Sequence, residues 1–107
     1  MHPEEAARLS LGPFILDGAT RRVMVAGRRV RLTALEFRLL HTLLGRHGDA
    51  QTRTDLLQLV WRAQPDIRTR TVDMHVQRLR AKLGKAGAWI ETVRGVGYRV
   101  RPPEASR

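Results

Sequence analysis

The sequence predicts an α+β fold in which an antiparallel sheet comes first, three helices follow and a β-hairpin ends the domain. Three observations predict this order. Residues 9–32 are short alternating apolar runs separated by turn signals, residues 33–84 carry apolar side chains at helical spacing, and residues 89–100 alternate again around two glycines. A helix pair followed by a basic hairpin is the plan of a winged helix-turn-helix.

The first segment is expected to form an antiparallel meander of about three strands. Its apolar runs, "LSLGPFIL", "RRVMVA" and "RVRL", are separated by Asp17-Gly18 and Gly27-Arg28. Such glycine-containing breaks between β-branched runs are hairpin signals. Pro13 has no amide hydrogen to donate, so it predicts an edge or a bulge in the first strand.

Capping pairs mark the beginnings of the first two helices. Thr33 and Glu36 form a T-x-x-E capping box ahead of a leucine-rich run, which predicts a helix to about residue 46. Thr52 has an acid three residues later and begins "RTDLLQLVW", a short helix. Pro65 prevents that helix from continuing, so "RAQPDIRT" is expected to be a loop.

Residues 70–84, "RTVDMHVQRLRAKLG", are expected to form a third helix with two distinct faces. At 100° per residue, the aliphatic side chains fall within one narrow stripe, made of Val72, Val76, Leu79 and Leu83. Polar and cationic side chains gather on the other side: Thr71, Met74, Arg78 and Lys82, with Arg70, His75 and Gln77 near them. Gly84 is the expected stop, and "WIETVRGVGYRV" then predicts a hairpin in which Gly95 and Gly97 permit the turn.

The composition is that of one domain, with 107 residues and no cysteine. We expect residues 1–8 to be a tail or interdomain linker, residues 9–101 to be the domain and residues 102–107 to be a C-terminal tail. A reducing cytoplasm is the default compartment for a chain without cysteine. No run approaches the ~18 apolar residues of a membrane helix, so no membrane partner is expected.

Charge favours a polyanionic partner, because 20 Lys and Arg against 10 Asp and Glu give a net charge of +10. The third helix contributes strongly: residues 68–82 hold five cations and a single acid, Asp73, so pairing along the helix cannot neutralise them. Anionic lipid is an alternative partner. The apolar stripe of this helix has no Trp or Phe, however, and it is needed to cover a small core.

The sequence shows no pattern typical of a catalytic site or a metal site. The serines, Ser10 and Ser106, lie near the two ends, and the four histidines have neither cysteine partners nor an i, i+4 pair. The G-x-G of "RGVGYR" lacks the third glycine and the following helix of a dinucleotide site. We therefore expect no catalysis, no metal and no cofactor. Trp61 and Trp89 are expected at the core or its edge.

Four motifs together carry a family resemblance. "LTALEFRLL", "TRTDLLQLVW", "RTVDMHVQRLRAKL" and "IETVRGVGYR" closely resemble, in order and spacing, the C-terminal effector domain of OmpR/PhoB-type response regulators, from about Leu9 to Arg101. The resemblance implies a four-stranded N-terminal sheet, so one further short strand is expected, at "AQT". It also implies that the third helix enters the major groove of DNA while the hairpin, or wing, reaches the adjacent minor groove.

The resemblance also implies which residues bind DNA. In the third helix, the base-reading positions fall on Thr71, Met74 and Arg78, with Arg80 as a further candidate, and Gln77 and Lys82 belong to the same face. Arg70 and His75 would lie at the DNA backbone. Arg94 would be the minor-groove arginine, with Thr92 and Tyr98 beside it, and Trp61 matches a position that can contact phosphate. The loop that faces RNA polymerase in such regulators here carries Arg62, Asp66 and Arg68. Met74 and Gln77 depart from the commoner residues, which leaves the base preference open.

Sequence-specific binding of duplex DNA is thus the expected function. The resemblance further implies a receiver domain, either removed from this chain or absent in a stand-alone form, and two copies placed head-to-tail on direct repeats. The isolated domain is expected to be monomeric and to bind weakly. The rival hypothesis is a regulatory module of the same fold that acts through protein–protein contacts, with its charge serving solubility.

Overall fold

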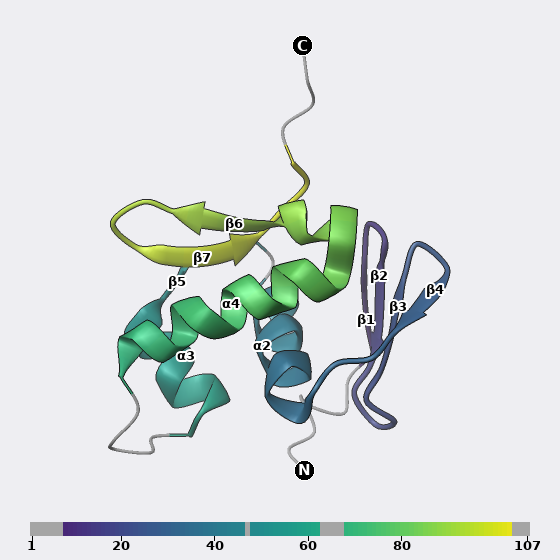
Figure 1. Cartoon of the computed structure of the whole chain (residues 1–107), viewed down its shortest axis with the longest axis horizontal. Coiled ribbons are helices and arrows are strands. Elements are labelled where there is room, and N and C mark those ends of the chain that lie inside the picture. The colour runs from purple at the N-terminus through teal and green to yellow at the C-terminus, as the bar shows by residue number, and fades with distance from the viewer. Residues whose placement is uncertain (1–7, 47, 63–67, 104–107) are drawn as a thin grey trace.

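The computed structural model in Figure 1 describes residues 8–46, 48–62 and 68–103. Within them, helices lie between an N-terminal sheet and a C-terminal hairpin (Figure 1). The N-terminal sheet has the order β1-β2-β3-β4, with antiparallel neighbours. Its strands are β1 (Arg8–Leu11), β2 (Phe14–Asp17), β3 (Arg22–Val25) and β4 (Arg28–Val30).

The N-terminal sheet corrects one prediction. "LSLGPFIL" is not one strand with a bulge at Pro13 but two strands, and Leu11 pairs with Phe14 across a turn at Gly12 and Pro13. Gly12 has a φ of 52°, which glycine adopts without steric cost, and Pro13 suits a turn because it has no amide hydrogen to donate. This division supplies the fourth strand that the resemblance implies.

Helix α2 (Ala34–Gly45) begins as the sequence predicts. The Glu36 amide donates to the Thr33 hydroxyl oxygen at 3.2 Å, and the Thr33 amide donates to Glu36 Oε1 at 2.8 Å, which completes the capping box. The leucines of the helix lie in the core, and Leu39, Leu40 and Leu43 have no exposed surface. The helix therefore forms the centre of the fold.

The "AQT" strand exists as β5 (Gln51–Thr52), but it does not join the N-terminal sheet. It pairs with β7 of the wing in a second sheet of order β5-β7-β6. Gly97 permits this pairing, because a Cβ atom there would lie 2.0 Å from the Gln51 carbonyl oxygen. Helix α3 (Arg53–Val60) follows directly, and its N-cap Thr52 accepts the Asp55 amide at 2.9 Å, as predicted.

Helix α4 (Thr69–Leu83) confirms the two-faced pattern. Val72, Val76 and Leu79 are fully buried and Leu83 is 5% exposed. The helix ends at Gly84, after which the chain makes a 3₁₀ turn, η1 (Gly84–Trp89), that the sequence did not predict. The Trp89 ring meets Phe14 edge-on, with 5.8 Å between ring centroids, and this contact joins the end of α4 to the N-terminal sheet.

The wing consists of β6 (Ile90–Val93) and β7 (Gly97–Val100), joined by a turn in which Gly95 has a φ of 77°. Glu91 fixes one end of it through ion pairs with Arg99 at 2.6 Å and Arg101 at 2.9 Å. With four N-terminal strands, three helices and this hairpin in the described residues, the predicted winged helix-turn-helix is confirmed. In the same residues no helix is long and apolar enough to cross a membrane.

The predicted domain limits are only partly visible. Arg8, assigned to the tail, is the first residue of β1. The rest of the N-terminal tail, residues 104–107 of the C-terminal tail, and Pro65 and Asp66 of the predicted loop lie outside the described residues.

Candidate nucleic-acid interface

The solvent-facing side of α4 carries an unpaired cationic surface. Arg70, Gln77 and Arg78 are exposed, and Met74 is 49% exposed. Neither Arg70 nor Arg78 makes a hydrogen bond or ion pair with another residue in the described part of the chain. Because the opposite stripe is buried, α4 is fixed in rotation, and these side chains can only face outward. We name Arg70, Thr71, Met74, Gln77 and Arg78 the outer face of α4.

His75 and Trp61 support this face from one side. His75 is half-buried, its Nδ1 lies 3.0 Å from the Thr71 carbonyl oxygen, and its ring meets the Trp61 ring edge-on at 5.1 Å. Trp61 itself is only 6% exposed. The structure therefore confirms Trp61 as a core aromatic, and its contact with His75 is the role that the geometry shows.

Arg80 and Thr92, both predicted to bind DNA, contact each other, and Thr92 is also exposed. Arg80 Nε and Nη2 donate to the Ile90 carbonyl oxygen at 3.1 and 2.8 Å, and Nη2 also donates to Thr92 Oγ1 at 2.8 Å. Arg80 follows Leu79 of the buried stripe, so its side chain leaves the helix toward β6 rather than toward solvent. This arginine fastens the wing to α4, and Figure 1 shows the hairpin running alongside that helix.

Tyr98, predicted to lie beside Arg94 at the DNA, is buried in the structure. It is 4% exposed, and its hydroxyl donates to Asp73 Oδ1. Arg53 Nε donates to the same oxygen at 2.6 Å, and the Arg53 guanidinium lies 5.1 Å from the centre of the Tyr98 ring. The β7 register places Tyr98 on the face that packs inward, between α3 and α4. Sequence reasoning missed this cluster of Arg53, Asp73 and Tyr98, which we name the wing anchor.

The wing anchor shifts the pKa values of its members. Burial by itself raises the pKa of Asp73, but the hydrogen bonds from Tyr98 and Arg53 outweigh it and hold the pKa of this carboxyl below its ordinary value. Burial and the bond to Asp73 raise the pKa of the Tyr98 hydroxyl. At neutral pH the carboxylate is therefore an acceptor and the hydroxyl a donor. The one sequence signal for the cluster was Asp73, the single acid in a cationic segment.

Lys82 also has a structural partner. Its Nζ lies 2.6 Å from Glu36 Oε1, and Glu36 is 3% exposed. Burial raises the pKa of Glu36, but bonds from Lys82 and Thr33 outweigh it and lower the pKa overall. Lys82 therefore joins the end of α4 to the start of α2. The side chain of Lys82 is thus directed toward α2, although it was predicted to belong to the DNA-binding face.

The tip of the wing is exposed and cationic. Arg94 and Gly95 are exposed, Val96 is 41% exposed, and Arg94 makes no hydrogen bond or ion pair with another described residue. Of the predicted polymerase-facing residues, Arg62 is exposed with a φ of 57° and Arg68 is the exposed N-cap residue of α4. Asp66 lies outside the described residues. Across the described ranges, no group of three or more His, Asp or Glu side chains could hold a metal ion.

Comparisons with known proteins agree with this geometry. The family "Transcriptional regulatory protein, C terminal" matches residues 27–100. The DNA-binding response regulator MtrA of Mycolicibacterium smegmatis is 42% identical over 103 residues, which are 94% of this chain and 45% of MtrA. The chain spans less than half the length of the curated relatives it matches.

Two similar structures are of DNA complexes. The DNA-binding domain of the response regulator AdeR, in complex with an intercistronic region, has a TM-score of 0.77 at 30% identity and covers 88% of this chain and 98% of its own. The Klebsiella pneumoniae RstA DNA-binding domain, in complex with the RstA box, has a TM-score of 0.77 at 33% identity. The match covers 87% of this chain and 95% of the RstA domain. The matching family is one of transcriptional regulators rather than of enzymes. The chain belongs to the family of C-terminal DNA-binding domains of OmpR/PhoB-type response regulators.

Proposed function

We propose that this chain binds duplex DNA in a sequence-specific manner, as the effector domain of a transcriptional response regulator. The observation that carries the proposal is the division of α4: its aliphatic stripe is buried, while its outer face presents Arg70 and Arg78 without an acidic partner among the described residues. A helix fixed in this way can lie in the major groove, which is wide enough to admit it.

The side chains would have different roles in DNA binding. Thr71, Met74, Gln77 and Arg78 would read base edges, whereas Arg70 and His75 would contact phosphates and set the register. Arg94, at the exposed wing tip, would enter the minor groove. Arg80, Thr92, Tyr98 and Lys82 would act indirectly, because their hydrogen bonds hold the wing and α4 in place. Trp61 would support His75 and could reach phosphate only from the edge of its ring.

Further partners belong to the proposal as well. In a regulator that also carries a receiver domain, two copies would bind head-to-tail on direct repeats, and the receiver contacts would raise their effective concentration. The isolated domain would then be monomeric and bind more weakly. Arg62, Asp66 and Arg68 would face RNA polymerase, and the setting would be the cytoplasm.

A salt titration tests the proposal against the rival protein-binding module. The affinity for duplex DNA should fall linearly with the logarithm of salt concentration, because each neutralised phosphate releases counterions and contributes a slope of about −0.9. Gel retardation of promoter fragments at rising KCl measures this slope. A flat dependence, or no retardation at low salt, would favour the rival.

Arg94→Ala should weaken binding most on sites whose flanking minor groove is A·T-rich. Narrow A·T minor grooves have an enhanced negative potential that attracts an inserted arginine, and the exposed Arg94 has no competing partner among the described residues. Fluorescence anisotropy with two duplexes that differ only in the flank, A·T or G·C, measures the effect. If the variant loses the same affinity on both flanks, the wing tip does not read the minor groove.

A further inference from the structure

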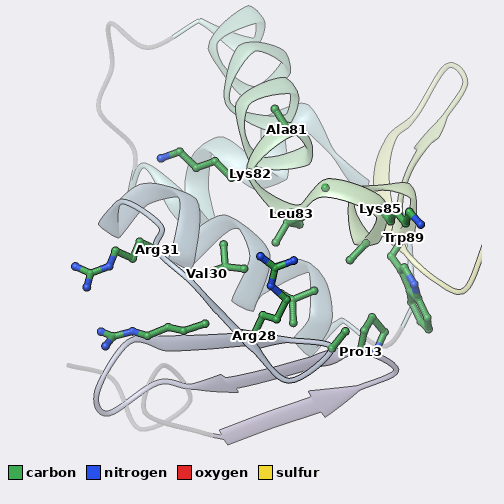
Figure 2. Close-up of a pocket in the computed structure, with 14 residues that line it drawn as sticks. Pro13, Arg28, Val30, Arg31, Ala81, Lys82, Leu83, Lys85 and Trp89 are labelled. Atoms are coloured by element: carbon green, nitrogen blue, oxygen red, sulfur yellow. The ribbon is translucent and has the colours of Figure 1, made fainter.

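A basic groove lies at the far end of α4 from the wing tip. It is bounded by the edge strand β4, by the last turn of α4 and by η1, and its volume is about 890 Å³. Figure 2 shows Arg28 pointing from β4 toward Leu83, with Arg31 and Lys82 on one side and Lys85 and Trp89 on the other. Lys82 is the only residue it shares with the predicted DNA contacts.

The rim of the groove is strongly and uniformly positive. Five cations line it, Arg28, Arg29, Arg31, Lys82 and Lys85, and none of the acids in the described part of the chain does. Lys82 is bound to Glu36, whereas the other four make no hydrogen bond or ion pair with any residue in the described ranges. Arg28 pairs with buried Val25 across the strands, and paired residues share a face of the sheet, so Arg28 points to the helix side.

The floor of the groove is apolar. Val30, Leu83, Ala86 and Trp89 contribute to it, together with Pro13 and Val25. A phosphate backbone would gain little from an aliphatic floor, and a single inorganic anion is far smaller than the groove. A peptide that combines carboxylates with large apolar side chains matches both the rim and the floor.

We propose that this groove binds an acidic peptide segment of a partner protein. One or two large apolar side chains of the segment would rest on Val30 and Leu83, and its carboxylates would pair with Arg28, Arg31 and Lys85. Because the outer face of α4 and the wing tip lie elsewhere, the domain would hold this partner and DNA at the same time. The groove is thus a second recognition site, independent of the DNA-binding proposal.

The experiment is a heteronuclear NMR titration of the ¹⁵N-labelled chain with the synthetic peptide DELDFEE. We expect saturable shift changes at residues 28–31 and 82–89. The double variant Arg28→Gln/Arg31→Gln should bind the peptide about tenfold more weakly, as the loss of two ion pairs implies. Arg8→Gln/Arg22→Gln removes the same charge from exposed strand positions outside the groove and should stay within about twofold of the wild type.

Further outcomes decide between the interpretations. The peptide DESDSEE, which keeps the acids and lacks the apolar residues, should bind more weakly; equal binding would overturn the role of the floor. If the two double variants lose the same peptide affinity, the effect is one of net charge and the groove is not a specific site. If the NMR shift changes at the groove are absent or do not saturate, the proposal is overturned. If Arg28→Gln/Arg31→Gln instead lost affinity for a 20-base-pair duplex, the groove would belong to the nucleic-acid surface. Lys85→Gln, at an exposed site, repeats the test should the double variant fail to fold.

Discussion

Replacing Arg78 with alanine is expected to weaken binding to the cognate site by about 1–3 kcal/mol and to change binding to random duplex much less. Arg78 is exposed on the outer face of α4 and has no partner among the described residues, so its guanidinium is free to donate two hydrogen bonds to a guanine edge. Competition between a cognate and a scrambled duplex at one salt concentration measures both affinities.

A matched variant separates base reading from charge. Arg22→Ala removes the same charge from an exposed position on β3, far from the outer face of α4, and should lower both affinities slightly and equally. If Arg78→Ala lowers the two affinities by the same factor, Arg78 is a phosphate contact rather than a base reader.

Removal of the Asp73 carboxylate is the second large effect that we expect. Asp73→Ala should lower the free energy of unfolding by about 1–2 kcal/mol, because Tyr98 and Arg53 both lose their shared acceptor in a partly exposed site. It should also reduce the preference for A·T-rich flanks, since the wing anchor is part of what holds the wing beside α4. Chemical denaturation and the two flanking duplexes measure these effects.

The stability effect should depend on pH in a defined direction. The pKa of Asp73 is lowered in the folded state, so the stabilisation is complete above the unfolded pKa of about 4 and is lost as the pH falls through the folded value. The difference between wild type and Asp73→Ala should therefore shrink in acid. Tyr98→Phe provides the control. In a double-mutant cycle with Asp73→Ala, the double variant should lose less unfolding free energy than the sum of the two single losses. Full additivity would show that the two residues act separately.

Features set by neighbouring residues could be predicted from the sequence. The capping box of Thr33 and Glu36 spans three residues, and the stripe from Val72 to Leu83 follows the period of one helix, so the pattern itself contains both partners. Because the stripe fixed which side of α4 is buried, the outer face with Arg70, Met74 and Arg78 was predicted as well.

Contacts between distant segments could not be predicted in this way. Lys82 and Arg80 are cations of the same helix as Arg78, yet their partners, Glu36 and Thr92, lie 46 and 12 residues away in the sequence. Only the packing of α4 against α2 and the wing shows that these two side chains are bound to residues of the same domain. Similarly, a tyrosine next to a wing arginine resembles a DNA contact until the register of β7 places its ring in the core.

Selection of bound sites from a random-duplex pool tests sequence-specific binding through α4 most directly. The wild-type chain should enrich one short motif, and Arg78→Ala should relax the preference at a single position within it while leaving the rest recognisable. A pool that stays random after repeated rounds at low salt, although the chain retains DNA, would contradict the account. It would mean that the outer face of α4 binds the phosphate backbone and does not read bases.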